Sequence, residues 1–372
     1  MNAPSLNPFR PGLARARMAS QARHQAGVTL VELMVTIAIN LLLVLAATLL
    51  YLNTRNTQKA VDERGAIFES GQLALDLLGR EIGNAAFYPA VSVEPLSTAK
   101  VPGNNVLWSH DLATTQSMSG VPEPYQHGVF GCSAQRFDVD KDACAALDSN
   151  SGPAGSDALV ISYFTNDALS LDRGQRSDCA HNDVANDKKL NLGRERAAGG
   201  ASAGTGTGVE GLGVAPDAPL LVVNRYQLVP TTFTVDGGAT VNTYALACNG
   251  NGNTGRGYQQ LIRGVEQLVV RYGVMDDGSL RPNRYLTATE VSVLGSQAID
   301  GTVYAPWQRV VSVRVCLLVR SGSASSLRTG ANGQAEPLTD CRGNAAYTPP
   351  SGAQVRRFEQ VFTVKNRQTN SV

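Results

Sequence analysis

The chain has 372 residues, of which 43% are hydrophobic and 17% are charged, and its net charge at pH 7 is +1. This composition is typical of a folded protein, and the length is enough for a sizeable core in one or two domains. The near-neutral charge argues against a dedicated nucleic-acid-binding protein, because phosphate recognition usually requires a basic surface.

The N-terminal region has the charge pattern of a basic leader followed by a membrane helix. Residues 1–31 contain Arg and His but no acidic residue, and residues 33–54 contain no charged residue. At about 1.5 Å per residue, a helix over residues 33–54 would be roughly 33 Å long, enough to cross a bilayer. Basic residues before the span favour a cytoplasmic N-terminus. We therefore expect a single-pass inner-membrane protein whose remainder is exported.

The junction between leader and apolar segment reads Gln25-Ala26-Gly27-Val28-Thr29-Leu30-Val31-Glu32-Leu33. It resembles the processing site of type IV prepilins, although most family members have Phe at the position of Val28. The resemblance implies that a prepilin peptidase cuts after Gly27 and methylates the amino group of Val28. It also implies that Glu32 pairs with the N-terminal ammonium of a neighbouring subunit, since charges in an apolar filament core are tolerable only when paired. A plain transmembrane anchor, with Glu32 among the lipid headgroups, instead predicts an uncut leader.

Beyond the apolar segment, the spacing predicts that the helix continues. We expect a leader over 1–27, a transmembrane or filament-core helix over 28–54 and an amphipathic continuation over 55–88. The apolar face of this continuation recurs at spacings typical of a helix and consists of Val61, Phe68, Leu75, Leu78 and Ile82. Four glycines weaken the pattern, because each costs about 1 kcal/mol relative to Ala inside a helix.

Residues 89–372 are expected to form a β-rich exported domain, with a long irregular surface insertion over about 165–219. The clearest predicted strands are 158–164, 220–229, 243–248, 259–272, 309–320 and 355–364. Most are joined by loops without a helical pattern, so an antiparallel sheet is favoured. The alternation of apolar and polar residues over 311–319 predicts a half-buried strand.

All six cysteines follow the apolar segment: Cys132, Cys144, Cys179, Cys248, Cys316 and Cys341. There is no Cys-x-x-Cys spacing, so in an exported chain we expect structural disulfides rather than a zinc or redox site. Six cysteines allow many connectivities. Proximity in the sequence favours Cys132–Cys144 and Cys316–Cys341, which leaves Cys179–Cys248.

One segment begins like a calcium-binding loop, with alternating Asp138, Asp140 and Asp142. The positions that need Gly and Glu in such a loop hold Ala143 and Ser149. An acidic surface loop is therefore favoured over a metal site, and no metal or cofactor is expected. The sequence also contains no recognisable nucleophile elbow, HExxH motif or catalytic triad signature, so we do not expect an enzyme.

Several further blocks resemble PilW-type minor pilins: residues 69–78 with 80–82, 156–160, 261–268 with 272–273, 307–314, and 356–358 with 363–364. The resemblance implies an α+β, type IV pilin-like fold, in which a long N-terminal helix packs on a C-terminal antiparallel sheet domain with long loops. It also implies a structural subunit that primes pilus assembly and caps the pilus tip. Its partners would be other minor pilins, the major pilin, the prepilin peptidase and the inner-membrane assembly platform, with lipid around the helix before assembly and no nucleic acid.

Two alternatives share parts of this pattern. A minor pseudopilin of a type II secretion system has the same leader, glutamate and helix. An adhesin or DNA-uptake module at the tip would use the poorly matched residues 90–219, because loops tolerate variation and often carry function.

Overall fold

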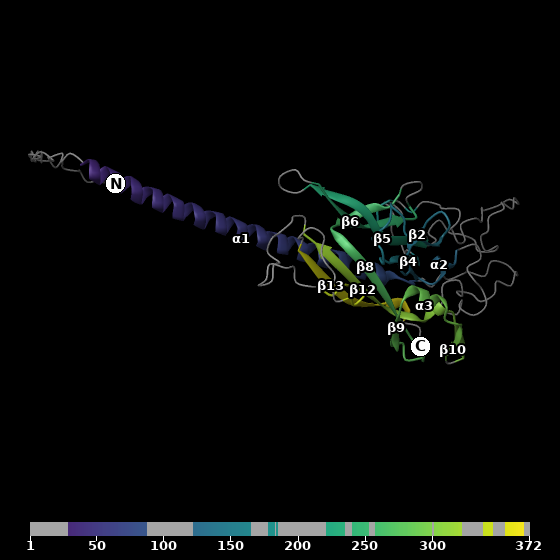
Figure 1. Cartoon of the computed structure of the whole chain (residues 1–372). Helices are drawn as coiled ribbons and strands as arrows, with labels where there is room; N and C mark the ends of the chain where they lie inside the picture. The colour runs from purple at the N-terminus through teal and green to yellow at the C-terminus, as the bar shows by residue number, and fades with distance from the viewer. Residues whose placement is uncertain are drawn as a thin grey trace, which may run out of the picture. The chain divides into compact units, whose positions relative to one another are not determined.

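The computed structural model describes residues 29–87, 122–164, 178–182, 184, 221–234, 240–252, 257–299, 301–321, 338–344 and 354–367 (Figure 1). The chain divides into two units, Met1–Gln58 and Lys59–Val372. A long helix, α1 (Leu30–Asn84), is followed by strands whose described pairings are all antiparallel. The predicted α+β class, with a long N-terminal helix and antiparallel sheets, is confirmed.

The part of α1 in the first unit is uncharged and apolar over most of its length. A window of this helix has the length and composition of a membrane span, and none of that window is buried within the described structure. The hydroxyl groups of Thr36, Thr48 and Thr54 donate hydrogen bonds to backbone carbonyls in the preceding turn, at 2.7–2.9 Å. These bonds satisfy polar groups that would be costly to bury in an apolar environment.

In the second unit, one face of α1 is buried from Ile67 onward. Leu75, Leu78 and Ile82 belong to this face, as predicted, but Val61 is 60% exposed and Phe68 48% exposed. The prediction was wrong for Val61 because the buried stripe of the helix begins only at Ile67. The helix also ends earlier than the predicted Tyr88. The backbone turns away at Ala86, whose φ is 57° and whose N–H donates to the carbonyl of Ser162 at 3.0 Å.

Two main sheets form the second unit (Figure 1). The first has the order β1 (Val129–Cys132), β4 (Ala158–Phe164), β5 (Leu221–Thr234), β6 (Thr240–Gly250) and β7 (Gln259–Arg263). The second has the order β13 (Val355–Thr363), β12 (Val310–Arg320), β8 (Val265–Val274) and β9 (Arg284–Leu286). The remaining described elements are the hairpins β2 (Arg136–Asp138)–β3 (Ala143–Ala145) and β10 (Gln297–Ile299)–β11 (Thr302–Tyr304), and the short helices α2 (Glu123–Gln126), α3 (Ala288–Ser292), η4 (Pro306–Arg309) and η6 (Lys365–Arg367).

The predicted strand over 259–272 is in fact two strands in different sheets, which is a correction. They are separated at Gly264, whose φ is 81°. Its N–H donates to the carbonyl of Tyr244 in β6, and its carbonyl accepts from the N–H of Arg320 in β12, both at 2.8 Å. Gly264 therefore bonds to both sheets at the point where the chain passes from one to the other. Glycine adopts this positive φ at no steric cost, whereas a side chain would be strained.

The strand predicted to be half-buried, β12, is buried on both faces apart from the partly exposed Arg314 side chain. Val313, Val315 and Leu317 belong to the main core, which also contains the buried residues of α1. On the other face, Arg320 pairs with Glu266 at 3.3 Å, and both side chains are almost completely buried. Of the polar residues that suggested a solvent-facing side, Ser312 is buried, whereas the Arg314 side chain is 37% exposed and pairs with Glu359.

Two helix glycines allow aromatic side chains of β13 to approach α1 closely. A Cβ atom on Gly71 would lie 2.5 Å from the ring of Phe358, and one on Gly79 would overlap the ring of Phe362. Gly71 and Gly79 are eight residues apart in the helix, and Phe358 and Phe362 are four residues apart in the strand. Both separations correspond to roughly 12–13 Å, so the two glycine–phenylalanine contacts lie side by side along the helix and the strand. This packing explains glycines that helix propensity disfavours.

A pair of Gly→Ala substitutions tests this explanation. We expect Gly71→Ala to lower the free energy of unfolding by roughly 1 kcal/mol, because overpacking against Phe358 outweighs the gain in helix propensity. The matched control is Gly65→Ala, where a Cβ would meet nothing within 4 Å, so stability should rise by up to about 1 kcal/mol. Urea unfolding of the full chain in detergent measures both, and a stabilising Gly71→Ala would contradict the packing argument.

Candidate functional site

The candidate assembly site lies at the start of α1. Glu32 is in the first helical turn and exposed, and its backbone N–H donates to the hydroxyl of Thr29 at 3.3 Å. A carboxylate is favourable at this end because the helix dipole is positive there. The other predicted site residues, Gly27 and Val28, lie outside the described residues. Within the described residues, the site thus consists of one exposed carboxylate at the N-terminal end of an apolar helix.

The structure contains three disulfides, Cys132–Cys144, Cys179–Cys248 and Cys316–Cys341. Proximity in the sequence favoured the first and third of these pairs, and Cys179–Cys248 is the pair that then remained. Their Cα–Cα distances are 5.6–6.3 Å, which is the usual range for a disulfide. Each disulfide joins two residues on separate strands or loops, so all three reduce the conformational freedom of the unfolded chain.

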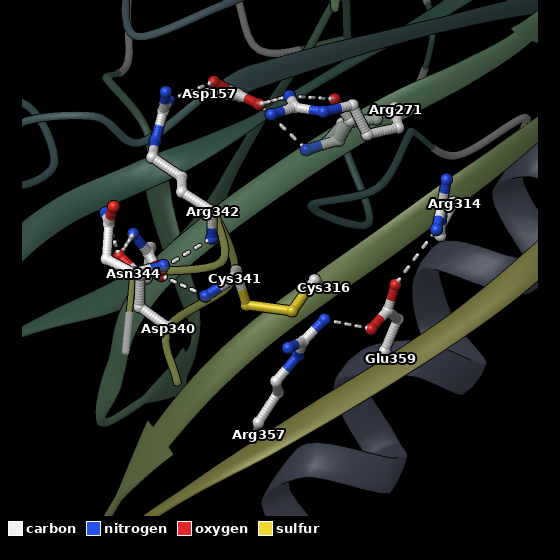
Figure 2. The surroundings of a disulfide bond; sticks show 12 residues. Asp157, Arg271, Arg314, Cys316, Asp340, Cys341, Arg342, Asn344, Arg357 and Glu359 are labelled. Atoms are coloured by element: carbon white, nitrogen blue, oxygen red, sulfur yellow. Dashed lines mark hydrogen bonds and ion pairs between the residues drawn. A yellow bond between two sulfur atoms is a disulfide. The ribbon is translucent and has the colours of Figure 1, made fainter. Parts of the chain in front are cut away.

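The Cys316–Cys341 disulfide attaches the segment 338–344 to β12 (Figure 2). Asp340 shapes this segment, since its carboxylate accepts the N–H groups of Arg342 and Asn344 at 2.9 and 2.8 Å. The guanidinium group of Arg342, directly after Cys341, donates a hydrogen bond to the Asp157 carboxylate at 3.0 Å. The disulfide therefore holds the segment where its arginine can reach a carboxylate at the start of β4.

Asp157 connects the two sheets. It precedes β4 of the first sheet and accepts the backbone N–H groups of Ala134 and Val270, each at 2.8 Å, Val270 being in β8 of the second sheet. A guanidinium nitrogen of Arg271 lies 3.8 Å from a carboxylate oxygen of Asp157 (Figure 2). Burial raises the pKa of Asp157, although these hydrogen bonds and both arginines favour its charged form. The sequence does not reveal the role of Asp157, because its partners lie far away along the chain.

The three aspartates of the calcium-like segment do not share a site. Asp138 ends β2, and its carboxylate accepts the N–H groups of Asp140 and Lys141 at 3.1 and 3.3 Å, which shapes the β2–β3 turn. Asp140 is exposed, and Asp142 accepts a hydrogen bond from the Tyr125 hydroxyl. No cluster of three or more metal-ligating side chains occurs among the described residues.

Comparisons with known proteins match the two ends of the chain. The family model for the prokaryotic N-terminal methylation motif matches residues 22–48, which include Gly27, Val28 and Glu32. The model for the type IV pilus-assembly protein W family matches residues 232–367, from within β5 to η6. The comparison with curated proteins finds no match.

Among solved structures, the chain is similar to a type IV-like pilin from Thermus thermophilus, with 10% identity over 80% of this chain and 95% of the other. The TM-score of 0.28 is too low to support an argument about the fold. The family assignment depends on the two family matches, which agree with the long apolar N-terminal helix and the antiparallel sheets. The prepilin methylation motif over residues 22–48 and the PilW match over residues 232–367 support the assignment of this chain as a PilW-type, type IV pilin-like minor pilin.

Proposed function

We propose that this chain is a structural minor pilin that primes type IV pilus assembly and sits at the pilus tip with other minor pilins. The observation that carries the proposal is the combination of a methylation motif, an uncharged exposed helix directly after it, and a PilW match in the folded unit. The first two features are those of a subunit inserted by its helix into a membrane or filament. The third supports a role distinct from the major pilin.

In this proposal the leader 1–27 remains cytoplasmic, and the prepilin peptidase cuts after Gly27 and methylates Val28. The apolar helix then leaves the lipid and enters the filament with the help of the assembly platform. There, Glu32 pairs with the N-terminal ammonium of a neighbouring minor or major pilin. Pairing offsets the large cost of placing each charge in apolar surroundings. The subunit contributes geometry to the filament and has no catalytic activity.

Mass spectrometry of the N-terminal peptide from membrane and sheared-pilus fractions of the native cell tests the proposal. A peptide that begins with N-methylated Val28 in both fractions supports processing and pilus membership. An intact leader in cells with a working prepilin peptidase would overturn the proposal. A processed peptide confined to the membrane, together with a secretion defect in a deletion strain, would favour the type II pseudopilin.

A second experiment separates assembly from surface binding. Phe164 pairs with Leu221 in adjacent strands, and Val184 packs against Val222. Residues 185–220 can therefore be replaced by a short Gly-Ser linker that retains Val184 and the Cys179–Cys248 disulfide. Retained piliation with lost adhesion or DNA uptake would assign this insertion to binding, whereas lost piliation would assign it to assembly.

A further inference from the structure

The last turns of α1 carry a carboxylate that points into the second unit. Glu81 is partly buried, and its Oε2 atom accepts a hydrogen bond from the side-chain amide of Asn224 in β5 at 2.6 Å. Asn224 is completely buried, and its own oxygen accepts the N–H of Cys179 at 3.0 Å. One amide thus joins the helix, the first sheet and the turn that is tied to β6 by the Cys179–Cys248 disulfide.

The charged and titratable groups around Glu81 come from each element that packs near it. Arg80 on the same helix is exposed, so water screens its charge. Tyr163 of β4 and Tyr226 of β5 stay neutral, because burial raises the pKa of both hydroxyl groups. Asp178 adds a second buried carboxylate, which accepts N–H groups of Ala180, Asn182 and Gly252.

These surroundings disfavour the charged form of Glu81. Burial is the largest effect and raises its pKa above the ordinary value of 4.5, and the charge of Asp178 acts in the same direction. The hydrogen bond from Asn224, the hydroxyl group of Tyr226 and the charge of Arg80 act in the opposite direction without cancelling the effect of burial. A neutral Glu81 can keep the Asn224 hydrogen bond, since a carbonyl oxygen accepts as well as a carboxylate oxygen.

We propose that the contact between Glu81 and Asn224 is a pH-responsive joint that holds the end of α1 more firmly to the first sheet in mildly acidic surroundings. Between 4.5 and its raised folded-state pKa, Glu81 binds a proton in the folded chain but not in the unfolded chain. The stability that it contributes is therefore complete below pH 4.5 and is lost as the pH rises through the folded-state pKa. This property belongs to the second unit and is independent of the proposed role in the pilus.

Hydrogen exchange of Leu78–Ala86, in the full chain in detergent micelles, tests the joint. Glu81→Gln keeps an acceptor for Asn224 and cannot ionise, and comparing variants at the same pH removes the intrinsic pH dependence of exchange. At pH 7.5 we expect stronger protection in Glu81→Gln than in the unaltered chain. This advantage should decrease by about tenfold per pH unit between the folded-state pKa and 4.5. The control, Glu69→Gln, changes an exposed carboxylate of the same helix and should have no effect.

Equal protection in Glu81→Gln and the unaltered chain at every pH would overturn the proposal, as would weaker protection in the variant. The unaltered chain offers an independent check if Glu81→Gln does not fold. Carboxyl ¹³C NMR of the isotope-labelled protein should show Glu81 titrating above 4.5, whereas a titration at or below this value would also overturn the proposal.

Discussion

Replacing Glu32 with Ala is expected to reduce the amount of this subunit in sheared pili by more than about a hundredfold, with its amount in the inner membrane unchanged. In the proposed pairing, the substitution would leave the N-terminal ammonium of a neighbouring subunit unpaired in the apolar core of the filament. Leaving one member of a buried ion pair unpaired costs about 3–5 kcal/mol, and each 1.4 kcal/mol corresponds to about a tenfold change in an equilibrium. Quantitative immunoblotting of sheared and membrane fractions measures the effect.

The matched control for Glu32→Ala is Glu69→Ala, which also removes one exposed carboxylate from α1. Glu69 belongs to the charged part of the helix, far along the chain from the amino terminus, so incorporation should stay normal. Equal incorporation of Glu32→Ala and the unaltered subunit would contradict the pairing role. A loss of the protein from the membrane fraction would point instead to a defect in insertion or stability.

Asp157→Ala is expected to have the largest effect on the folded unit, lowering the free energy of unfolding by about 3–5 kcal/mol. The carboxylate is 3% exposed, and its removal leaves the buried N–H groups of Ala134 and Val270 without their acceptor. It also removes the acidic partner of Arg342, which reaches Asp157 from the disulfide-linked segment (Figure 2). Urea unfolding of the full chain in detergent, with the disulfides intact, measures the loss.

Glu359 provides a control for Asp157, because it also lies between two arginines. It pairs with Arg314 at 3.7 Å and with Arg357, but its side chain is 32% exposed (Figure 2). Ion pairs in contact with water contribute about 0–1 kcal/mol, so Glu359→Ala should change stability by no more than that. Similar losses in the two variants would show that Asp157 does not connect the sheets in the way its hydrogen bonds indicate.

Features that depend on neighbouring residues could be predicted from the amino-acid sequence. The charge pattern of residues 1–54 and the short motif around Gly27 and Glu32 are local, and they indicated the apolar helix and the prepilin family. Strand β4 was predicted with its observed bounds, because β-branched and aromatic side chains fit the pleated surface of a sheet. Proximity favoured the two disulfides with the shortest sequence separations, 12 and 25 residues. With those four cysteines paired, Cys179–Cys248 remained.

The contacts between distant residues, in contrast, became known only from the folded chain. Nothing local indicates that Gly264 divides an apolar run between two sheets, that both faces of β12 are covered, or that Gly71 makes room for Phe358. Arg342 reaches Asp157 across 185 residues, and Asn224 reaches Glu81 across 143. The physical reason is that side-chain periodicity indicates how apolar each face of an element is, but not which distant residues cover that face. The partner of each buried group is chosen by the packing of the whole chain.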